Sequence, residues 1–473
     1  MSDIPNPTTH EDTICALATA SGGALGIIRI SGPQALAATS GICSVPCTSV
    51  AANTVHFTRI IEHDAASERH GEVIDEALVT VFRAPHSYTG EDSVEISCHG
   101  SRYILNKVLE LLCKHGCRMA RPGEFTMRAY LNSKLDLSQA EAVADLIAST
   151  NRATHQMAMS QLRGYFSSQL AQLREQLLKL TSLLELELDF SDHEDLEFAN
   201  RSELLELTKK IDNHLVRLAH SFETGQALKQ GIPVAIVGKT NVGKSTLLNA
   251  LLKEDRAIVS NIHGTTRDTI EDTIDIQGVT FRFIDTAGIR QTTDEVEQIG
   301  ISRTYAAIDK ARIVLWMVDE EPSQEELNKM CLYSDNKKLI VVRNKIDKVD
   351  NKPFILAKIP LIEISAKHGL HLSDLEQAIY QAADIPSLGA TDVIVTNARH
   401  YDALIRAHDH IQRVIDGLGE ANSQLSITNS QLPPDLLAED LRQALDTLAE
   451  ITGGQITPNE VLGNIFKNFC VGK

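Results

Sequence analysis

The N-terminal quarter of the chain carries short runs in which apolar residues cluster or alternate with polar ones. Gly, Pro and Ser bound these runs, a combination that is typical of β-strands. The runs occupy residues 13–18, 25–30, 77–82 and 94–97. We therefore expect residues 1–120 to form a mixed α+β domain.

Beyond this domain the apolar residues recur every three or four positions, which predicts amphipathic helices. The periodicity runs from residue 138 to about 220 and returns over 398–413 and 436–451. Between these segments strands alternate with helices, as in a doubly wound α/β sheet. Because a helical bundle needs all its faces covered, we favour an α/β domain inserted into a helical domain over two separate flanking helical segments. The expected domains are residues 1–120, 121–222, 223–383 and 384–473.

The clearest chemical signal is a glycine-rich loop in the α/β domain. Residues 238–245 read GKTNVGKS, after an apolar run and before a helical segment. Backbone N–H groups that converge at a helix N-terminus bind anions, and this full pattern predicts a nucleotide phosphate loop. Lys244 is expected to reach the β- and γ-phosphates, and the Ser245 hydroxyl to bind Mg²⁺. The other expected contacts from this loop are Asn241, Val242, Gly243 and Thr246.

Three further motifs follow the phosphate loop in the order that GTPases use. Asp285 ends a strand and could hold the Mg²⁺ shell through water, while Gly288 lets a backbone N–H approach the γ-phosphate. The Asp347 carboxylate can accept two hydrogen bonds from guanine, which adenine cannot donate, so the expected ligand is GTP. A Ser-Ala-Lys segment would turn backbone N–H groups toward guanine O6. The predicted contacts are Asp285, Thr286, Ala287, Gly288, Asn344, Lys345, Asp347, Ser365, Ala366 and Lys367.

The residue that positions the attacking water is not evident from the motifs. Ile289 stands where many small GTPases have a Gln, and an apolar side chain cannot orient water. Asp294, Glu295 and Glu297 follow in a segment that could fold over the phosphates. For Asp294 and Glu295 we favour a solvated acidic loop.

Charge neutralisation at the phosphates is also open, since the loop holds no arginine. The Asn241 amide oxygen could hold a monovalent cation there, in place of an arginine finger. Between the loop and the next motif, Thr265 or Thr266 is the candidate to reach Mg²⁺ and the γ-phosphate in a nucleotide-sensing switch.

Composition sets limits on location and partners. The formal net charge is −18, so the body of the protein should repel nucleic acid unless a local basic face exists. No apolar run is long enough to cross a membrane, and residues 1–12 lack a secretory signal. The eight cysteines are scattered, which fits a reducing cytoplasm. The spacing of Cys43 and Cys47, and of Cys113 and Cys117, favours buried thiols over a zinc site.

Two further segments of the helical domain have unusual compositions. Acidic residues between positions 185 and 197 predict a solvated segment rather than a metal site. The C-terminal tail is apolar, so we expect it to pack against the protein. Cys470 could be a nucleophile or a packed thiol, and the sequence favours packing.

Several segments outside the GTPase motifs carry a family resemblance. They are GIIRISGP at 26–33, YTGED at 88–92, RPGEF at 121–125, NSKLDL at 132–137 and FCVGK at 469–473. With these, the chain resembles the MnmE (TrmE) family of tRNA-modification GTPases from end to end. Val471 stands where the family usually has Ile, a change of one methylene.

The resemblance implies a P-loop GTPase domain inserted into a helical domain, with an α+β N-terminal domain that binds tetrahydrofolate and dimerises the protein. It implies a cytoplasmic enzyme that acts with the flavoprotein MnmG, in a heterotetramer, on the wobble uridine (U34) of certain tRNAs. An aminomethyl or carboxymethylaminomethyl group would be added at C5, with 5-formyl- or 5,10-methylene-tetrahydrofolate supplying one carbon. FAD and NADH would bind only the partner. The implied folate contacts are Arg29, Glu91, Lys134 and Lys473.

The resemblance also implies GTPase activation by K⁺ and nucleotide-dependent dimerisation. Asn241 would ligate K⁺ with oxygens of Ser260, Ile262 and Thr265, while Ser245 and Thr266 hold Mg²⁺. Glu297 would be the catalytic carboxylate, with Lys244 and Cys470 as the other catalytic residues. The expected nucleotide contacts of the switch segment are Ser260, Asn261, Ile262, His263, Gly264, Thr265 and Thr266. Two alternatives stay open: a regulatory ribosome- or RNA-associated GTPase switch, and a dimeric scaffold that gates a partner's chemistry.

Overall fold

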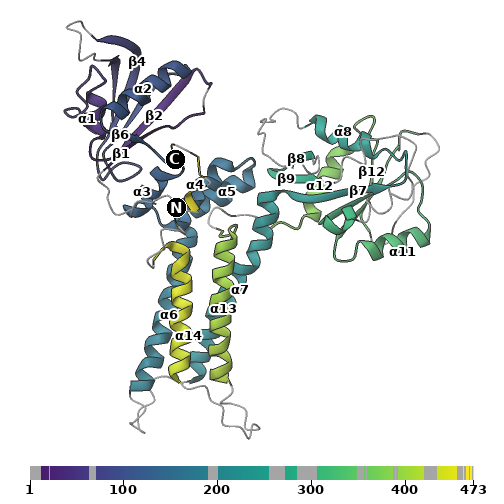
Figure 1. Cartoon of the computed structure of the whole chain (residues 1–473). Coiled ribbons are helices and arrows are strands. Elements are labelled where there is room, and N and C mark those ends of the chain that lie inside the picture. Colours follow the sequence, from purple (N-terminus) through teal and green to yellow (C-terminus); the bar gives the residue numbers. More distant parts are fainter. Residues whose placement is uncertain are drawn as a thin grey trace, which may run out of the picture. The chain divides into compact units, whose positions relative to one another are not determined.

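The protein is described here by a computed structural model. It describes residues 12–20, 22–62, 71–189, 201–254, 272–284, 306–348, 356, 359–386, 389, 392–419, 434–454, 462, 465–467, 469–470 and 472. The chain divides into two compact units (Figure 1). The first unit comprises Met1–Ala148, Ala158–Asn213 and Ala403–Lys473, and the second comprises Ser149–Met157 and His214–Asp402. Because the second unit interrupts the first in sequence, the predicted insertion is confirmed, while the predicted domain boundaries stay predictions.

The first unit begins with a six-stranded sheet in the order β3-β4-β5-β2-β1-β6. All neighbouring strands are antiparallel except β1 and β6, which are parallel. Helices α1 and α2 cover one face, where strand residues such as Ile28 and Ile96 meet Val108 and Leu112 of α2 in one apolar core. The elements are β1 (Thr13–Leu17), β2 (Leu25–Ser31), α1 (Ala35–Ser40), β3 (Thr54–Glu62), β4 (Glu72–Phe82), β5 (Ser93–His99), α2 (Arg102–Lys114) and β6 (Cys117–Met119).

The four strands predicted in this domain are confirmed as β1, β2, β4 and β5, but the pattern missed two others. β6 has only three residues, too few for any period to show. β3 has charged or imidazole side chains within its alternation, at His56 and Arg59, which weakened the apolar signal.

Helices make up the rest of the first unit, and three of them continue into the second. Leu177, Leu180 and Leu184 of α6 are buried, as their spacing predicts, and α6 packs against α14. The helices are α3 (Glu124–Leu131), α4 (Leu137–Ala148), α5 (Arg152–Leu162), α6 (Tyr165–Asp189), α7 (Arg201–Gln230), α13 (Ala398–Gly419) and α14 (Pro434–Thr452). The division between units falls within α5, α7 and α13.

The second unit contains a six-stranded sheet in the order β12-β11-β10-β7-β9-β8. Only the β8–β9 pair is antiparallel. Helices α8 and α12 pack on one face, and α11 with residues 306–310 lies on the other. The elements are β7 (Ile232–Gly238), α8 (Lys244–Glu254), β8 (Asp272–Ile276), β9 (Val279–Phe283), β10 (Ile313–Val318), α11 (Gln324–Tyr333), β11 (Lys338–Arg343), β12 (Leu361–Glu363) and α12 (Leu372–Ala382).

This arrangement confirms the predicted doubly wound sheet. All six residues of β10 are buried, as expected for a central strand covered on both faces. The parallel strands β7, β11 and β12 end at the same edge, so the segments that follow them come together there. Within the described part of the chain, no helix is long and apolar enough to span a membrane.

Candidate functional site

The glycine-rich loop joins β7 to α8, as the sequence predicts. Its backbone is left-handed at Asn241, with φ of 60°, and at Gly243, with φ of 105°. A Cβ at position 243 would lie 2.3 Å from Nδ2 of Asn344, so this position has no room for a side chain. The loop therefore depends on glycine both for its conformation and for close approach of a neighbouring motif.

Lys244 lies at the start of α8 with its ammonium group turned back over the loop. Its Nζ donates hydrogen bonds to the carbonyl oxygens of Gly238 and Lys239, each at 2.7 Å. Burial lowers the pKa of Lys244, because the charged form loses hydration. A phosphate beside Nζ would offset that loss, so the position suits an anionic ligand.

Asn344 joins three of the predicted motifs. Its side chain is buried, donates from Nδ2 to the Val242 carbonyl oxygen at 2.8 Å and accepts from the Ala366 N–H at 3.0 Å. One amide thus fixes the phosphate loop and the Ser-Ala-Lys segment to the end of β11. The sequence predicted Asn344 only as a nucleotide contact and did not reveal this tethering role.

Asp347 is held by the same segment. Its Oδ1 accepts a hydrogen bond from Ser365 Oγ at 2.6 Å, and its Oδ2 lies 3.8 Å from Nε2 of His368. The Ser365 hydrogen bond keeps the pKa of Asp347 below its usual value. The side chain is partly exposed and ionised at neutral pH, as an acceptor for guanine needs to be. Close by, Lys345 pairs with Asp319 at 2.8 Å and ties this motif to the end of β10.

Of the other predicted nucleotide-site residues, Ser245, Thr246 and Lys367 are described, whereas the predicted residues between positions 260 and 297 lie outside the described part of the chain. They include the candidate Mg²⁺ and K⁺ ligands of the switch segment, the strand-end aspartate and the catalytic carboxylate. They are Ser260, Asn261, Ile262, His263, Gly264, Thr265, Thr266, Asp285, Thr286, Ala287, Gly288, Ile289, Asp294, Glu295 and Glu297.

A second candidate site lies in the first unit, around Arg29 of β2. The Arg29 guanidinium lies 5.5 Å from the ring centroid of Tyr88 and 5.8 Å from that of Phe125. It pairs with Glu95 at 2.8 Å and donates to the Gly472 carbonyl oxygen at 3.3 Å. The C-terminal tail therefore reaches this predicted folate residue, although Lys473 itself lies outside the described residues.

Glu91 and Lys134 lie near one another on the adjoining loops. Glu91 accepts a hydrogen bond from Ser31 Oγ at 2.7 Å. Lys134 Nζ donates to the Pro85 carbonyl oxygen at 3.0 Å. A Cβ at Gly90 would lie 3.3 Å from Cγ of Lys134, which shows how closely these loops approach. Three of the four predicted folate residues thus come from one region of the first unit.

Sequence reasoning missed the charged residues that hold this region together. Arg128 of α3 is buried and pairs with Glu91 at 3.1 Å, Asp12 at 2.7 Å and Glu124 at 3.4 Å. Arg118 pairs with the same Asp12 and Glu124. We call these five residues the N-terminal charge network. The only sequence signal for Arg128 was its position four residues after Glu124, a spacing that is too common to single it out.

The charge network shifts the protonation of its own members. Burial raises the pKa of Glu124, but the hydrogen bonds and charges of Arg118 and Arg128 and the Arg121 N–H outweigh it, so the pKa is lowered overall. The pKa of Asp12 is lowered by the same two arginines against its own burial. Both carboxylates are therefore charged in the folded protein at neutral pH.

The C-terminal tail packs through its apolar residues, as predicted. Leu462 and Phe466 are buried against Leu137 and Ala140 of α4. The Cys470 thiol is exposed, so the preference for a packed thiol was wrong. The apolar contacts end before Cys470, whose backbone carbonyl is held by the Gly123 N–H at 3.4 Å. Elsewhere, Cys43, Cys47 and Cys117 are buried and Cys113 is exposed.

Comparison with known proteins covers nearly the whole chain. The family model described as the MnmE helical domain matches residues 137–470, and that of the GTP-binding protein TrmE N-terminus matches residues 13–134. The chain is 52% identical to the tRNA modification GTPase MnmE of Phocaeicola vulgatus, over 98% of this chain and 99% of that protein. It is 51% identical to the protein of the same name from Bacteroides thetaiotaomicron, over 98% of this chain and all of that one.

A solved structure, the G domain of the T. maritima FeoB iron transporter, is 25% identical to this chain. The match covers 32% of this chain and 98% of the FeoB chain. Its TM-score of 0.24 is too low to bear on the fold. The two family models and the identity to full-length relatives decide the matter without it. The chain belongs to the MnmE family of tRNA modification GTPases.

Proposed function

We propose that this chain hydrolyses GTP as part of the modification of the wobble uridine (U34) of certain tRNAs. In this proposal it acts in the cytoplasm with the flavoprotein MnmG, which carries FAD and NADH, and adds an aminomethyl or carboxymethylaminomethyl group at C5. The observation that carries the proposal is the guanine side of the site, where Asn344 joins the phosphate loop to Ala366 in a member of this family. That arrangement supports GTP as the nucleotide.

The nucleotide chemistry follows from the positions of the loop residues. Lys244 would leave its carbonyl partners to bind the β- and γ-phosphates, and Ser245 with Thr266 would hold Mg²⁺. Mg²⁺ would neutralise charge that develops on the phosphates. We assign Glu297 to orienting the attacking water, because Ile289 cannot. This assignment rests on the sequence and the family resemblance.

We also propose that K⁺ assists hydrolysis. Asn241 stands at the left-handed bend of the loop, and no arginine lies between residues 238 and 245. Its amide oxygen, with oxygens from Ser260, Ile262 and Thr265, would form the cation site. Turnover should then be much faster in KCl than in NaCl at equal ionic strength, because the smaller Na⁺ fits such a site poorly. Equal rates in the two salts would remove K⁺ from the proposal.

The N-terminal domain is the proposed site for a tetrahydrofolate derivative. Its residues suit the ligand in three respects. The Tyr88 ring is 38% exposed and offers an apolar face for a flat heterocycle, and Arg29 and Lys134 offer cations for carboxylates. Glu91 offers an acceptor whose position Ser31 and Arg128 fix. A bound folate would bring the one-carbon unit toward the C-terminal tail, where Cys470 is exposed.

A homodimer through the N-terminal sheet is part of the proposal. Phe57 and Leu78 are cross-strand neighbours on β3 and β4, and they are 61% and 47% exposed. Val55 on the same face of β3 is 59% exposed. Apolar side chains gathered on an edge strand in this way are typical of a surface that a second chain covers.

Nucleoside analysis of tRNA tests the proposed reaction. Cells that lack this chain should lose the C5 modification of U34, and the parent gene should restore it. A variant with Asp347 replaced by Asn serves as the matched control, because it should fold but bind GTP poorly. Equal U34 modification in cells with and without the chain would overturn the proposal in favour of a regulatory RNA-associated GTPase.

A further inference from the structure

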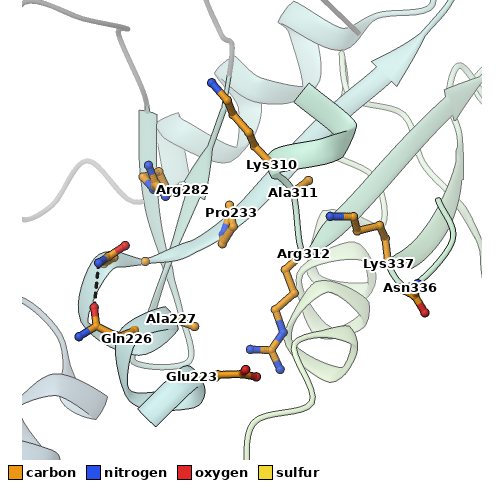
Figure 2. Close-up of a pocket in the computed structure, with 12 residues that line it drawn as sticks. Glu223, Gln226, Ala227, Pro233, Arg282, Lys310, Ala311, Arg312, Asn336 and Lys337 are labelled. Atoms are coloured by element: carbon orange, nitrogen blue, oxygen red, sulfur yellow. Dashed lines mark hydrogen bonds between the residues drawn. The ribbon is translucent and has the colours of Figure 1, made fainter. Parts of the chain in front are cut away.

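A cavity of about 380 Å³ lies in the second unit (Figure 2). This volume is at the small end of ligand-binding cavities, which span roughly 300–1,000 Å³. Most of the residues that line it are polar or charged. The lining residues are Glu223, Gln226, Ala227, Gln230, Gly231, Pro233, Arg282, Lys310, Ala311, Arg312, Asn336 and Lys337.

The cavity lies at the edge of the sheet opposite the nucleotide site. Pro233 is the second residue of β7, whereas the phosphate loop follows the last residue of that strand. Arg312 and Lys337 directly precede β10 and β11, which run parallel to β7. Arg282 is the β9 partner of Pro233. A ligand here would leave the phosphate loop free.

Four cations and one carboxylate line the cavity. The cations are Arg282, Lys310, Arg312 and Lys337, and the carboxylate is Glu223. Asp309 directly precedes Lys310 and Asp335 directly precedes Asn336, but neither aspartate is part of the lining. This local excess of positive charge stands against a formal net charge of −18 for the chain. It provides the kind of local basic face that nucleic-acid binding by an acidic protein requires.

Within the described part of the chain, three of the cations have no ion pair to compensate their charge. Among the described residues, neither Arg312 nor Lys310 takes part in an ion pair or a side-chain hydrogen bond. Lys337 Nζ donates to the Asp309 carbonyl oxygen at 2.7 Å, a neutral partner that leaves its charge in place. Figure 2 shows the Arg312 guanidinium extending toward Glu223, yet the two are not within ion-pair distance in the described structure.

Arg312 is held in place by the sheet rather than by a charged partner. Its N–H donates to the Pro233 carbonyl oxygen at 2.9 Å, and its own carbonyl oxygen accepts from Lys338 N at 3.0 Å. A fixed backbone lowers the entropy that a long side chain loses when it binds a ligand. The cation is therefore ready to bind an anion with little rearrangement of the chain.

One structural role competes with ligand binding. The cavity borders the C-terminal end of α7, where the helix dipole attracts positive charge. A single cation in the last turn satisfies that demand, whereas four surround this cavity. If the cations served only α7, their removal would lower stability and leave every binding property unchanged.

We propose that this cavity binds backbone phosphates of the tRNA substrate; the inference rests on the proposed function for the identity of the RNA. The lining offers guanidinium, ammonium and amide donors and no aromatic ring, so it suits phosphates rather than stacked bases. Phosphate contacts position an RNA without reading its sequence. The tRNA thus docks on the side of the GTPase sheet opposite the nucleotide.

The test measures binding of an unmodified tRNA transcript to the full-length chain across a range of KCl concentrations. In the double variant Arg312→Gln, Lys310→Gln, affinity should fall about tenfold at low salt. The slope of log K against log salt should shrink by about 0.7–0.9 for each phosphate that the variant no longer binds. Glu223→Gln removes the one carboxylate and should strengthen binding about two- to threefold, the opposite sign. Lys329→Gln on α11 is the control, because Lys329 is exposed and pairs with Glu325, and it should leave binding unchanged.

Further readouts separate the possible failures. GTP hydrolysis should stay at the parent rate in all of these variants, since the cavity is remote from Lys244. Parental tRNA affinity in the double variant, with or without a lowered melting temperature, would overturn the inference in favour of a role in capping α7. Stabilisation by inorganic phosphate that the double variant loses, without any change in its tRNA binding, would overturn the RNA assignment. Either result would leave the proposed function standing if U34 modification still depends on this chain.

Discussion

The guanine side of the nucleotide site and the N-terminal charge network both fix polar side chains in buried positions, but they do so by different chemistry. At the guanine side one neutral amide, Asn344, joins two backbone segments by short hydrogen bonds. In the charge network a buried cation, Arg128, balances Asp12, Glu91 and Glu124. Burial costs an ion far more hydration free energy than it costs a neutral amide. A buried ion therefore depends on every one of its partners being present.

Because of this difference, the two regions are vulnerable to different substitutions. Loss of a tether at the guanine side should weaken ligand binding more than folding, because the sheet beneath it has its own core. Loss of the central cation should weaken folding itself, because Arg118 alone would then be left to compensate Asp12 and Glu124, and Glu91 would lose its ion pair with Arg128. Four variants test that contrast.

Arg128→Met should have the largest effect. It removes the buried cation and leaves charged carboxylates in place, which lowers the free energy of unfolding by about 3–5 kcal/mol. Thermal unfolding of the full-length protein would show a large fall in the melting temperature. Arg118→Met is the matched control, because Arg118 is 41% exposed and water can replace it in part. Equal stability of the Arg128 variant and the parent would show that the network is not structural.

Asn344→Ala should mainly affect the nucleotide. The Val242 carbonyl and the Ala366 N–H each lose a buried partner, at about 1–2 kcal/mol apiece, so GTP affinity should fall by roughly 30- to 1,000-fold. Calorimetric titration with GTP measures this directly. Asn328→Ala on the exposed face of α11 should change nothing. A variant that unfolds as readily as Arg128→Met would erase the contrast between the two regions.

Asn344 and Arg128 also show how much of the structure could be predicted from the sequence. Asn344 lies in a contiguous motif whose order and spacing identify a GTPase, so its place at the site could be predicted, though not its tethering bonds. The partners of Arg128 are spread along the chain, with Asp12 116 positions away. No local period records a contact of that range. In the N-terminal domain the strands followed from the pattern of apolar residues except for β3 and β6, where charge or shortness hid the pattern.

The basic cavity could not be predicted from the sequence, for the same reason. Its four cations are isolated in sequence, at positions 282, 310, 312 and 337, and only the parallel sheet brings them together. Net charge indicated that RNA binding would require a local basic face, but it could not locate one. Exposure of Cys470 was missed because the apolar run before it suggested continued packing.

Asp347→Asn should change the preferred nucleotide base from guanine to xanthine. The amide offers an N–H where guanine needs an acceptor, so GTP affinity should fall by roughly 10- to 100-fold while xanthosine triphosphate gains. Competition binding with the two nucleotides measures the switch. Ser365→Ala should cause a smaller loss without a switch, because it only frees the Asp347 carboxylate to move. Unchanged GTP preference in the Asn variant would count against the assignment.

Arg29→Ala should have the smallest effect of the four, confined to folate. A charged hydrogen bond to the ligand is worth about 1–2 kcal/mol, so its removal should lower affinity by roughly 5- to 30-fold. Titration with 5-formyltetrahydrofolate checks this, and GTP hydrolysis should stay intact. Arg59→Ala, which removes an exposed arginine paired with Glu76, is the control. Parental folate affinity would show that the cation serves only Glu95 and the tail.

The close approach of Gly243 to Asn344 restricts how this enzyme can evolve. Because a Cβ at position 243 would collide with the Asn344 amide, an alanine mutation there is expected to be deleterious for as long as Asn344 remains. Asn344 in turn cannot be exchanged for a bulkier residue while glycine keeps the loop so near. Two codons far apart in the gene are thus epistatic, and sequences that diverge at one position are expected to have diverged at the other.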